Sequence, residues 1–331
     1  MNMGPAGVNV DGHRRRRTLS LVLGSGGARG YAHIGVIEEL ERQGFEIRSI
    51  AGSSMGALVG GVYAAGKLQQ WRDWVLPLQR LDVLRMVDWT LTGGGFIKGD
   101  RIVRMLREQI GEIDIEDLPI RYTAVAVDLD AQREVWFSRG SLFDAIRASI
   151  AIPTIFRPHR VQGRLLVDGG LLNPLPVSPT LSDMTDITIA VDVNAMAEPL
   201  PGVMPLPGDD PSQRVRSDAD ASPPRSRSRR LFGALLGRRL PAAIAREPGL
   251  LELFSRTLDV VQETITRLKL AAQPPDLLIT IPRNVCTFYD FHRAEEAIEI
   301  GRVRTREALA QWLPLQRRCA DPSDRDIDSR G

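Results

Sequence analysis

Two consecutive strand–turn–helix units open the chain and restrict its fold more than any other feature. Residues 18–23 (TLSLVL) form a short apolar run that predicts a buried strand, and the glycine-rich loop 24–30 (GSGGARG) leads from it into a helix that ends at Gly44. Residues 45–51 predict a second strand, and a helix of small, apolar residues over 55–65 follows. Helices that connect successive strands in this way are typical of α/β folds with parallel strands.

The rest of the chain continues this alternation. Residues 122–127 and 134–137 predict two strands joined by a polar turn, and residues 141–150 predict a helix that Ser141 caps. About six to seven strands with helices between them predict an α/β three-layer sandwich, in which helices cover both faces of a mostly parallel central sheet. The remaining predicted elements are strands over 165–167, 187–193 and 277–281 and a long helix over 290–312.

Composition divides the chain into a folded domain and three segments that we expect to be disordered. Residues 1–17 form a basic leader, and residues 314–331 form a polar tail. The predicted core covers residues 18–198, and residues 250–313 complete the same domain with a helix, a strand and a helix. Between these parts, residues 199–249 hold nine of the 22 prolines and nine arginines, which predicts a mobile insertion.

Two segments bear on membrane contact. Within the insertion, apolar pairs at 231–232 and 235–236 stand one helical turn apart between arginine pairs, a spacing that fits a short amphipathic helix on a bilayer surface. We favour a disordered linker there because the segment is short. The uncharged stretch 49–66 is rich in glycine and serine and does not predict a transmembrane helix. Without a secretory signal, we expect a cytoplasmic protein with at most transient, peripheral contact with a membrane.

Charge and cysteine content exclude several function classes. The 43 Lys and Arg residues exceed the 41 Asp and Glu residues by only two, so the composition does not predict nucleic-acid binding. Cys286 and Cys319 are the only cysteines, too few for a disulfide scaffold or a cysteine-based zinc site. The four histidines leave little room for a histidine-rich metal centre.

Gly52-Ser53-Ser54-Met55-Gly56 is a G-x-S-x-G sequence between a predicted strand and a helix of small residues. A serine at such a sharp turn adopts strained backbone angles, and the neighbouring glycines let the chain and a substrate approach closely. The helix N-terminus favours negative charge that develops nearby. The same five residues also occur in glycine-rich packing helices, so it is the strand-to-helix context that makes Ser54 a candidate nucleophile.

The glycine-rich loop 24–30 is a candidate anion site, because backbone N–H groups converge at a strand-to-helix turn of this kind. The anion is either a dinucleotide pyrophosphate or the oxyanion of an acyl-transfer intermediate. A dinucleotide site requires an acidic residue at the end of the next strand, to bind a ribose. That strand ends in Ala51-Gly52-Ser53-Ser54 instead, which favours the oxyanion.

The third candidate is Asp168, which follows a short strand and precedes Gly169 and Gly170. This position directs an aspartate toward a cleft at the end of a sheet, although Asp-Gly is also a common turn. Any contact between Asp168 and Ser54 is tertiary, since the two residues are far apart in the sequence.

Together with their flanking residues, these three motifs resemble the bacterial patatin-like phospholipases, and in particular the group related to the catalytic domain of neuropathy target esterase. The resemblance extends over about residues 19–192 and resumes near residue 250. The segments that carry it are 24–36 (GSGGARGYAHIGV), the Ser54 turn, the Asp168 turn, 148–156 (ASIAIPTIF), 173–177 (NPLPV) and 290–296 (DFHRAEE).

The resemblance implies a patatin-like three-layer fold and a Ser-Asp dyad, in which Ser54 is the nucleophile and Asp168 the base that acts on it directly. It implies no metal and no organic cofactor. A carboxylate with a pKa near 4 is a weak base for a hydroxyl, so we expect partial burial of Asp168 and strong stabilisation of the oxyanion. The expected intermediate is an acyl ester of Ser54.

The resemblance also assigns roles within the glycine-rich loop. The family's loop has the pattern G-x-G-x-x-G, and here Ser25 stands at the position of the first glycine. The implied oxyanion hole consists of the amides of Gly26, Gly27 and Ala28, with Arg29 and Gly30 supporting the loop.

These observations predict a serine acyl hydrolase that acts on lipid esters such as phospholipids, lysophospholipids or neutral esters. Two alternatives stay open. An α/β-hydrolase uses the chain order Ser, Asp, His, which His292 formally permits, although an exposed or capping role suits its place at a helix start. A weakly catalytic patatin fold with a regulatory or scaffolding role is the other. The sequence makes no prediction of oligomeric state or substrate selectivity.

Overall fold

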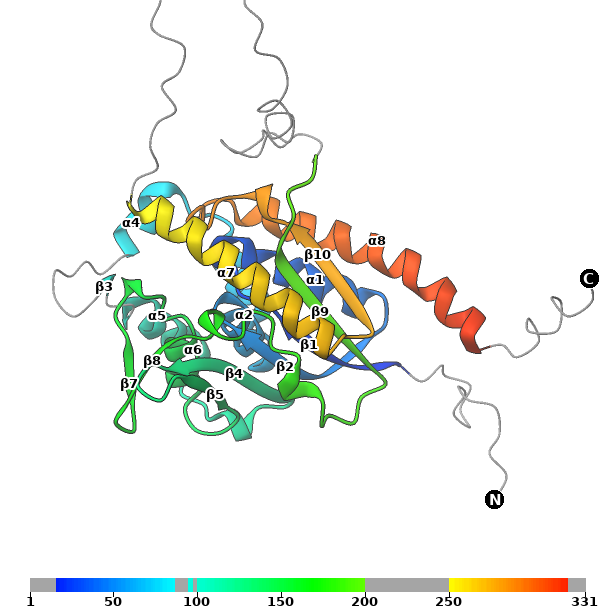
Figure 1. Cartoon of the computed structure of the whole chain (residues 1–331), viewed down its shortest axis with the longest axis horizontal. Coiled ribbons are helices and arrows are strands. Elements are labelled where there is room, and N and C mark those ends of the chain that lie inside the picture. Colours follow the sequence, from blue (N-terminus) through cyan, green and yellow to red (C-terminus); the bar gives the residue numbers. More distant parts are fainter. Residues whose placement is uncertain (1–15, 87–94, 98–99, 200–249, 321–331) are drawn as a thin grey trace, which may run out of the picture.

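The computed structural model describes residues 16–86, 95–97, 100–199 and 250–320, which build an α/β fold around one central sheet (Figure 1). Within these residues the sheet has eight strands. Seven follow the order β10-β9-β1-β2-β4-β8-β7, and β5 pairs with β4. The strands are β1 (Thr18–Leu23), β2 (Glu46–Ser53), β4 (Arg121–Asp128), β5 (Arg133–Phe137), β7 (His159–Val161), β8 (Arg164–Asp168), β9 (Ile187–Ala195) and β10 (Leu277–Pro282).

The topology of the sheet brings the ends of β2 and β8 together. The strands from β10 to β4 run parallel, whereas β5, β7 and β8 are antiparallel to their partners. Along β4, Ser53 of β2 pairs with Val125, and Asp168 of β8 pairs with Ala126. Because β5 occupies the opposite edge over residues 124–128, β2 and β8 share one edge and meet end to end.

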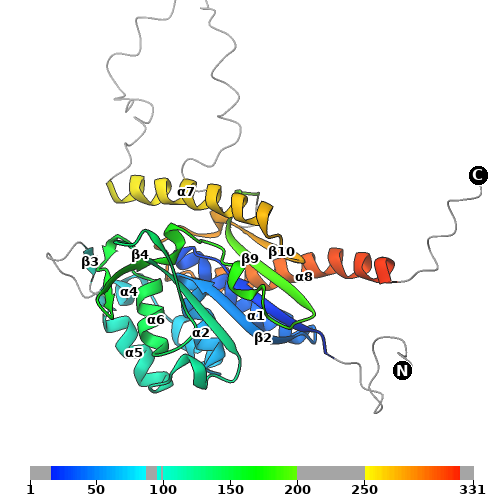
Figure 2. The ribbon, with the colours of Figure 1, turned by 60° about the horizontal axis from the view of Figure 1, so that its bottom comes forward.

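Helices cover both faces of the sheet, with most of them on one face, which confirms the predicted α/β class. Leu21 and Leu23 of β1 point into the large core that α1, α2, α6 and α8 share, whereas Val22 faces a smaller cluster on the other side. Leu270 of α7 packs on that smaller cluster, and Figure 2 shows α7 on the outside of the sheet. The helices are α1 (Ala32–Arg42), α2 (Met55–Ala64), α3 (Leu68–Val75), α4 (Arg80–Met86), α5 (Asp100–Ile110), α6 (Leu142–Ser149), α7 (Leu250–Ala272) and α8 (Ala294–Ala320), and a small separate sheet joins β3 (Gly95–Ile97) to β6 (Thr154–Phe156).

α1 and α8 pack in unusually close contact through two glycines. A Cβ on Gly35 of α1 would lie 1.9 Å from the carbonyl oxygen of Ile298, and a Cβ on Gly301 of α8 would lie 2.1 Å from that of Ala32. Real Cβ atoms do not approach backbone oxygens so closely, and a well-packed core tolerates added atoms poorly. Glycine is therefore required on both sides of this contact.

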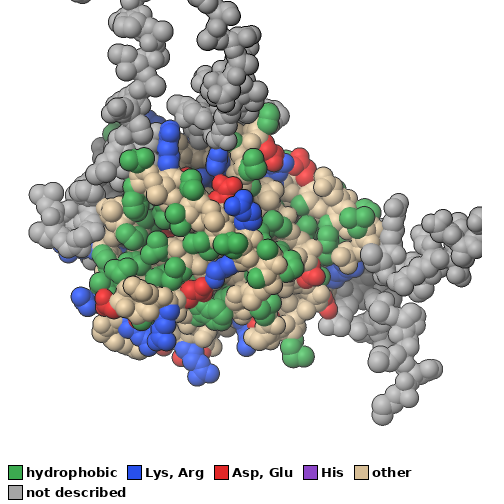
Figure 3. Space-filling view, in the orientation of Figure 1, with side chains coloured by type: hydrophobic (Ala, Val, Ile, Leu, Met, Phe, Trp, Pro, Cys, Tyr) green, Lys and Arg blue, Asp and Glu red, His purple; other side chains and the backbone are tan. Residues whose placement is uncertain are grey.

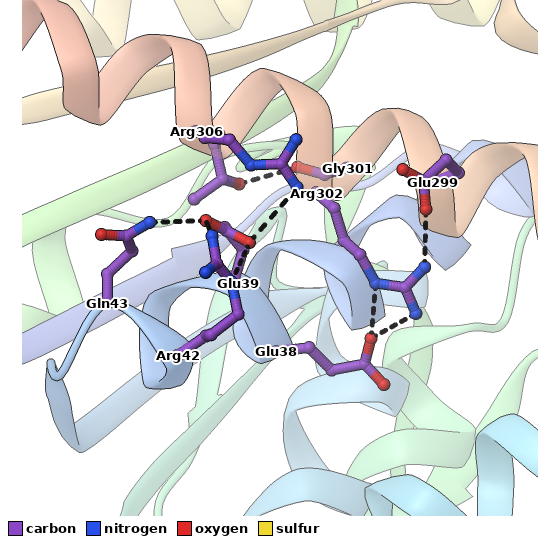
Figure 4. A network of polar contacts seen from close by, with 9 residues as sticks. Glu38, Glu39, Arg42, Gln43, Glu299, Gly301, Arg302 and Arg306 are labelled. Carbon is purple, nitrogen blue, oxygen red and sulfur yellow. Dashed lines mark hydrogen bonds and ion pairs between the residues drawn. The ribbon is translucent and has the colours of Figure 1, made fainter.

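A charged network borders the same contact (Figure 4). Arg302 of α8 donates from Nε and Nη2 to Glu38 of α1, at 2.9 and 2.6 Å. Glu39 is buried, and hydrogen bonds from Arg42 lower its pKa to about 2 against the opposing effect of burial. Arg306 lies 3.6 Å from the same carboxylate. The network fixes the rotation of α8 on α1.

The C-terminal helix differs from the prediction at both ends. It begins at Ala294 instead of residue 290 and continues to Ala320, so the expected disordered tail from residue 314 is wrong for its first seven residues. Pro314 stands inside the helix and removes one hydrogen bond to the carbonyl of Ala310. Ala310 is exposed, so water can satisfy its carbonyl group.

Several predicted segments lie outside the described residues. These are the basic leader up to residue 15, almost all of the Pro/Arg-rich insertion (200–249) and the tail from residue 321. Among the helices of the described ranges, none has both the length and the apolar content needed to cross a bilayer.

Candidate active site

Ser54 lies at a sharp turn between β2 and α2, as predicted. Its backbone has φ 55° and ψ −123°, a conformation that side-chain-bearing residues rarely adopt. A Cβ on Gly52 would lie 2.5 Å from the backbone of Gly56, and a Cβ on Gly56 would lie 2.1 Å from the carbonyl oxygen of Leu23. The two glycines of the G-x-S-x-G sequence therefore allow the tight packing that holds Ser54 in its strained conformation.

Asp168 lies directly against Ser54. The Oγ of Ser54 donates a hydrogen bond of 2.6 Å to Oδ2 of Asp168. The other oxygen, Oδ1, accepts from the N–H of Gly170 at 2.7 Å, which fixes the plane of the carboxyl group. Both side chains are buried, with 2% and 4% of their surface exposed. The structure thus brings together the two residues that the sequence places in the dyad.

Burial changes the acidity of this carboxyl group. It raises the pKa of Asp168 to about 7, while the hydrogen bonds from Ser54 and from the N–H of Gly170 oppose the shift. The dominant cause is desolvation, which disfavours the charged form. A carboxylate with a pKa near neutrality is a stronger base than an ordinary aspartate and is still ionised in part at pH 7.

The glycine-rich loop lies beside the serine turn, because β1 and β2 run parallel and Leu23 pairs with Gly52. Gly27 has φ +57°, and a Cβ there would lie 2.6 Å from the carbonyl oxygen of Phe288. The N–H of Ala28 donates to that same carbonyl at 3.0 Å. Among the described residues, the N–H groups of Gly26 and Gly27 have no such acceptor. The donor of Ala28 is therefore already engaged in this conformation, which argues against its predicted contribution to the oxyanion hole.

Arg29 and Gly30 stabilise the loop in different ways. Arg29 is buried, donates from Nε to the carbonyl oxygen of Gly26 at 3.3 Å and pairs with Asp259 of α7 at 2.7 Å. At Gly30, a Cβ would lie 2.3 Å from Cγ of Met55, so the missing side chain lets the loop contact α2. Both residues fit the supporting position that the sequence predicts for them.

His33 anchors the start of the loop. Its Nε2 lies 2.8 Å from the carbonyl oxygen of Gly24. Burial lowers the pKa of His33 to about 4, so the ring is neutral at pH 7. A neutral ring facing a carbonyl oxygen carries its proton on Nε2.

Ser149 contacts the serine turn, although no local pattern in the sequence singles it out. Its Oγ accepts the N–H of Ser54 at 2.9 Å and donates to the carbonyl oxygen of Val125 at 2.6 Å. It thereby ties the strained turn to β4. The signal was its position in the segment 148–156, which contributes to the family resemblance.

Helix α7 makes further contacts with the candidate site, which no local sequence pattern predicts. Gln262 is buried and donates to the Oγ of Ser25 at 3.4 Å, next to Asn194 of β9, which donates to the carbonyl oxygen of Ser25 at 2.7 Å. A Cβ on Gly170 would lie 2.6 Å from Nε2 of Gln262. α7 therefore contacts both the glycine-rich loop and the Asp168 turn.

His292 lies apart from the dyad. Its Nε2 is 3.4 Å from Nε of Arg80 in an exposed contact. Within the described ranges, neither Ser54 nor Asp168 has a hydrogen bond to a histidine. The geometry gives no support to a Ser-Asp-His triad.

Sequence comparison agrees with this architecture. The sequence model of the family described as patatin-like phospholipase matches residues 21–181. An uncharacterized NTE family protein of Mycobacterium tuberculosis is 42% identical over 341 residues, which cover 92% of this chain and 94% of that protein. Another from the same species is 31% identical over 91% of this chain and 48% of its own length. Lysophospholipase NTE1 of Yarrowia lipolytica is 31% identical over 56% of this chain, which spans 13% of that protein.

The fold, the serine turn and the family match define a patatin-like protein. Within that class, the extent of the mycobacterial matches shows that the chain belongs to the NTE family.

Proposed function

We propose that this protein is a serine acyl hydrolase that cleaves lipid esters through the Ser54–Asp168 dyad. The observation that carries the proposal is the 2.6 Å hydrogen bond from the Oγ of Ser54 to the buried carboxylate of Asp168, at a strained strand-to-helix turn. A hydroxyl in direct contact with a desolvated carboxylate is poised to lose its proton.

In the first half-reaction, Asp168 accepts the hydroxyl proton while the Oγ of Ser54 attacks the carbonyl carbon of the ester. The carbonyl oxygen becomes an oxyanion in the tetrahedral intermediate. When the carbon–oxygen bond to the alcohol breaks, Asp168 returns the proton to the departing alkoxide. The products are the free alcohol and an acyl ester on Ser54.

In the second half-reaction, water replaces the alcohol. Asp168 accepts a proton from the water, whose oxygen attacks the acyl carbon. The ester bond to Ser54 then breaks, the proton returns to Oγ, and the fatty acid leaves. Both halves need an ionised Asp168, so the raised pKa strengthens the base and limits the reaction at acidic pH.

The oxyanion hole is best assigned to the N–H groups of Gly26 and Gly27, because the donor of Ala28 is engaged by Phe288. Arg29 stabilises this loop by a hydrogen bond from its Nε to the carbonyl oxygen of Gly26. Each hydrogen-bond donor in such a hole contributes ~3 kcal/mol to transition-state stabilisation.

Two observations support a lipid as the ester. An apolar cluster that includes Phe288, Ile152 and Ile155 adjoins the glycine-rich loop, since the ring of Phe288 lies against Gly27. Such a surface suits an acyl chain. In addition, the fungal relatives are named lysophospholipases.

The test is hydrolysis of p-nitrophenyl esters and of a lysophospholipid panel by the wild type and by Ser54→Ala, Asp168→Asn and His292→Ala. The proposal predicts loss of activity in the first two and full activity in the third. A folded but inactive His292→Ala variant supports a triad instead. A wild type that is inert on every ester supports the scaffolding alternative.

A further inference from the structure

α7 (Leu250–Ala272) has one face against the candidate active site. Asp259 pairs with Arg29 of the glycine-rich loop, and Gln262 reaches Ser25 and the Asp168 turn. Phe254 and Leu258 pack against the apolar cluster around Phe288. α7 thus packs directly against the glycine-rich loop, the Asp168 turn and the apolar cluster.

The opposite face of α7 is apolar and exposed. Leu253, Val260, Val261 and Leu268 are 51%, 63%, 41% and 66% exposed. Their spacing places them on one side of a helix. Figure 2 shows α7 on the outside of the fold, and Figure 3 shows numerous hydrophobic side chains on the face of the molecule that α7 crosses.

The hydroxyl groups of two threonines on this outer face are hydrogen-bonded within the helix. The Oγ1 of Thr257 donates to the carbonyl oxygen of Leu253 at 2.9 Å, and that of Thr264 donates to Val260 at 3.0 Å. A hydroxyl that is satisfied within its own helix loses little when it leaves water. These positions therefore extend the apolar stripe.

The exposed face also carries two arginines. Arg256 and Arg267 are exposed there. Asp259 pairs with Arg29 of the glycine-rich loop, and Glu263, which is 43% exposed, lies 3.6 Å from Arg283. From residue 253 to residue 272, both acidic side chains thus lie beside an arginine of another element.

We propose that the outward face of α7, defined by Leu253, Val260, Val261 and Leu268 with Arg256 and Arg267, is a docking surface for an anionic lipid bilayer. The choice of a bilayer rests on the proposed lipid-ester function. An apolar stripe flanked by arginines is the pattern of helices that lie in a membrane interface. A second copy of the chain suits the face less well, because a symmetric contact brings like charges together.

The direct test is sedimentation of the full chain with vesicles of phosphatidylcholine, with and without phosphatidylserine, in the Ser54→Ala background so that binding is independent of hydrolysis. Val260→Glu/Val261→Glu is expected to weaken binding by about tenfold or more, because two carboxylates enter the interface. Arg267→Gln is expected to weaken binding only to vesicles that contain phosphatidylserine, by about fivefold.

Leu129→Glu/Leu315→Glu is the matched control. These leucines are 44% and 58% exposed and lie off α7, so the double variant is expected to bind like the parent. With Ser54 restored, Val260→Glu/Val261→Glu should hydrolyse a soluble p-nitrophenyl ester at the wild-type rate and lose activity on vesicles, which also shows that it is folded.

Equal binding by the α7 variant and the parent overturns the inference, as does equal loss in the Leu129/Leu315 control. A parent that is dimeric in solution and becomes monomeric in the Val260→Glu/Val261→Glu variant also overturns it, and assigns the face to a second copy. If the wild type fails to hydrolyse esters but the Ser54→Ala protein still binds vesicles, the result counts against the proposed function and leaves the docking surface supported.

Discussion

The Oγ of Ser54 and the Oδ2 of Asp168 lie 2.6 Å apart although 114 residues separate them in the sequence. The sheet explains this contact. β2 runs parallel to β4 and β8 runs antiparallel to it along the same edge, so the two strands end against each other at Val125 and Ala126. The contact between Ser54 and Asp168 therefore depends on β8, which runs antiparallel to β4, whereas β2 runs parallel to it.

The first prediction concerns pH. Because burial raises the pKa of Asp168 to about 7 and the base must be ionised, kcat/KM should rise with pH and reach half its maximum at about pH 7. The measurement is hydrolysis of a p-nitrophenyl ester, followed at a wavelength where the absorbance of p-nitrophenol does not depend on pH. A profile that is already flat from pH 5 upward contradicts the raised pKa.

The same carboxyl group should make stability depend on pH. The unfolded pKa of an aspartate is near 4 and the folded pKa of Asp168 is about 7, so the folded state retains a proton that the unfolded state releases. The wild type therefore loses stability, on the order of a few kcal/mol, as pH rises from about 4 to 7. Asp168→Asn lacks this loss.

Denaturant unfolding of both proteins across this range measures the effect, because other titrating groups cancel in the difference. The stability of Asp168→Asn relative to wild type should increase between pH 4 and 7 and then stay constant. A constant difference throughout shows that Asp168 has an ordinary pKa in the folded state.

Ser149→Ala should reduce catalysis without abolishing it. The change leaves the N–H of Ser54 and the carbonyl oxygen of Val125 without their shared partner, a cost of ~1–3 kcal/mol for buried groups. We expect kcat to fall by about tenfold to a hundredfold with little change in KM, because the turn positions the nucleophile. Ser53→Ala is the control, since its buried Oγ has no partner among the described residues. Equal losses in the two variants contradict a positioning role for Ser149.

The contact between α1 and α8 should be sensitive to a single methyl group. A Cβ at position 301 meets the carbonyl oxygen of Ala32 at 2.1 Å, so Gly301→Ala should destabilise the protein by ~1–3 kcal/mol. Gln311→Ala, at an exposed position of the same helix, should change stability little. Thermal unfolding of the two variants measures the difference, and an unchanged melting temperature in Gly301→Ala refutes the close contact.

Local patterns in the sequence were sufficient to single out Ser54 and Asp168 as candidates and to predict the first two strand–turn–helix units, whereas the pairing of the two residues came from the family resemblance. Ser54 follows a strand and precedes a helix of small residues, and its flanking glycines are explained by backbone contacts within that unit. Asp168 likewise follows its strand directly. The local conformation at each position depends on residues close to it in the chain, whereas the contact between the two side chains is tertiary.

Two interactions of the glycine-rich loop that the sequence did not predict are long-range. The carbonyl oxygen of Phe288 engages the N–H of Ala28, and Asp259 of α7 pairs with Arg29. The outcome in both cases depends on where a distant segment packs, which no pattern near the loop records. The continuation of α8 through Pro314 was not predicted either, because propensity alone places a helix end there.

The central claim is that Ser54 becomes acylated, and rapid quenching of the wild type with a p-nitrophenyl ester, followed by peptide mass spectrometry, tests it most directly. The account predicts an acyl adduct on Ser54 that forms in wild type and in Ser53→Ala, is absent in Ser54→Ala, and accumulates more slowly in Asp168→Asn. An adduct on Ser25 or Ser53, or steady hydrolysis by Ser54→Ala, contradicts the account.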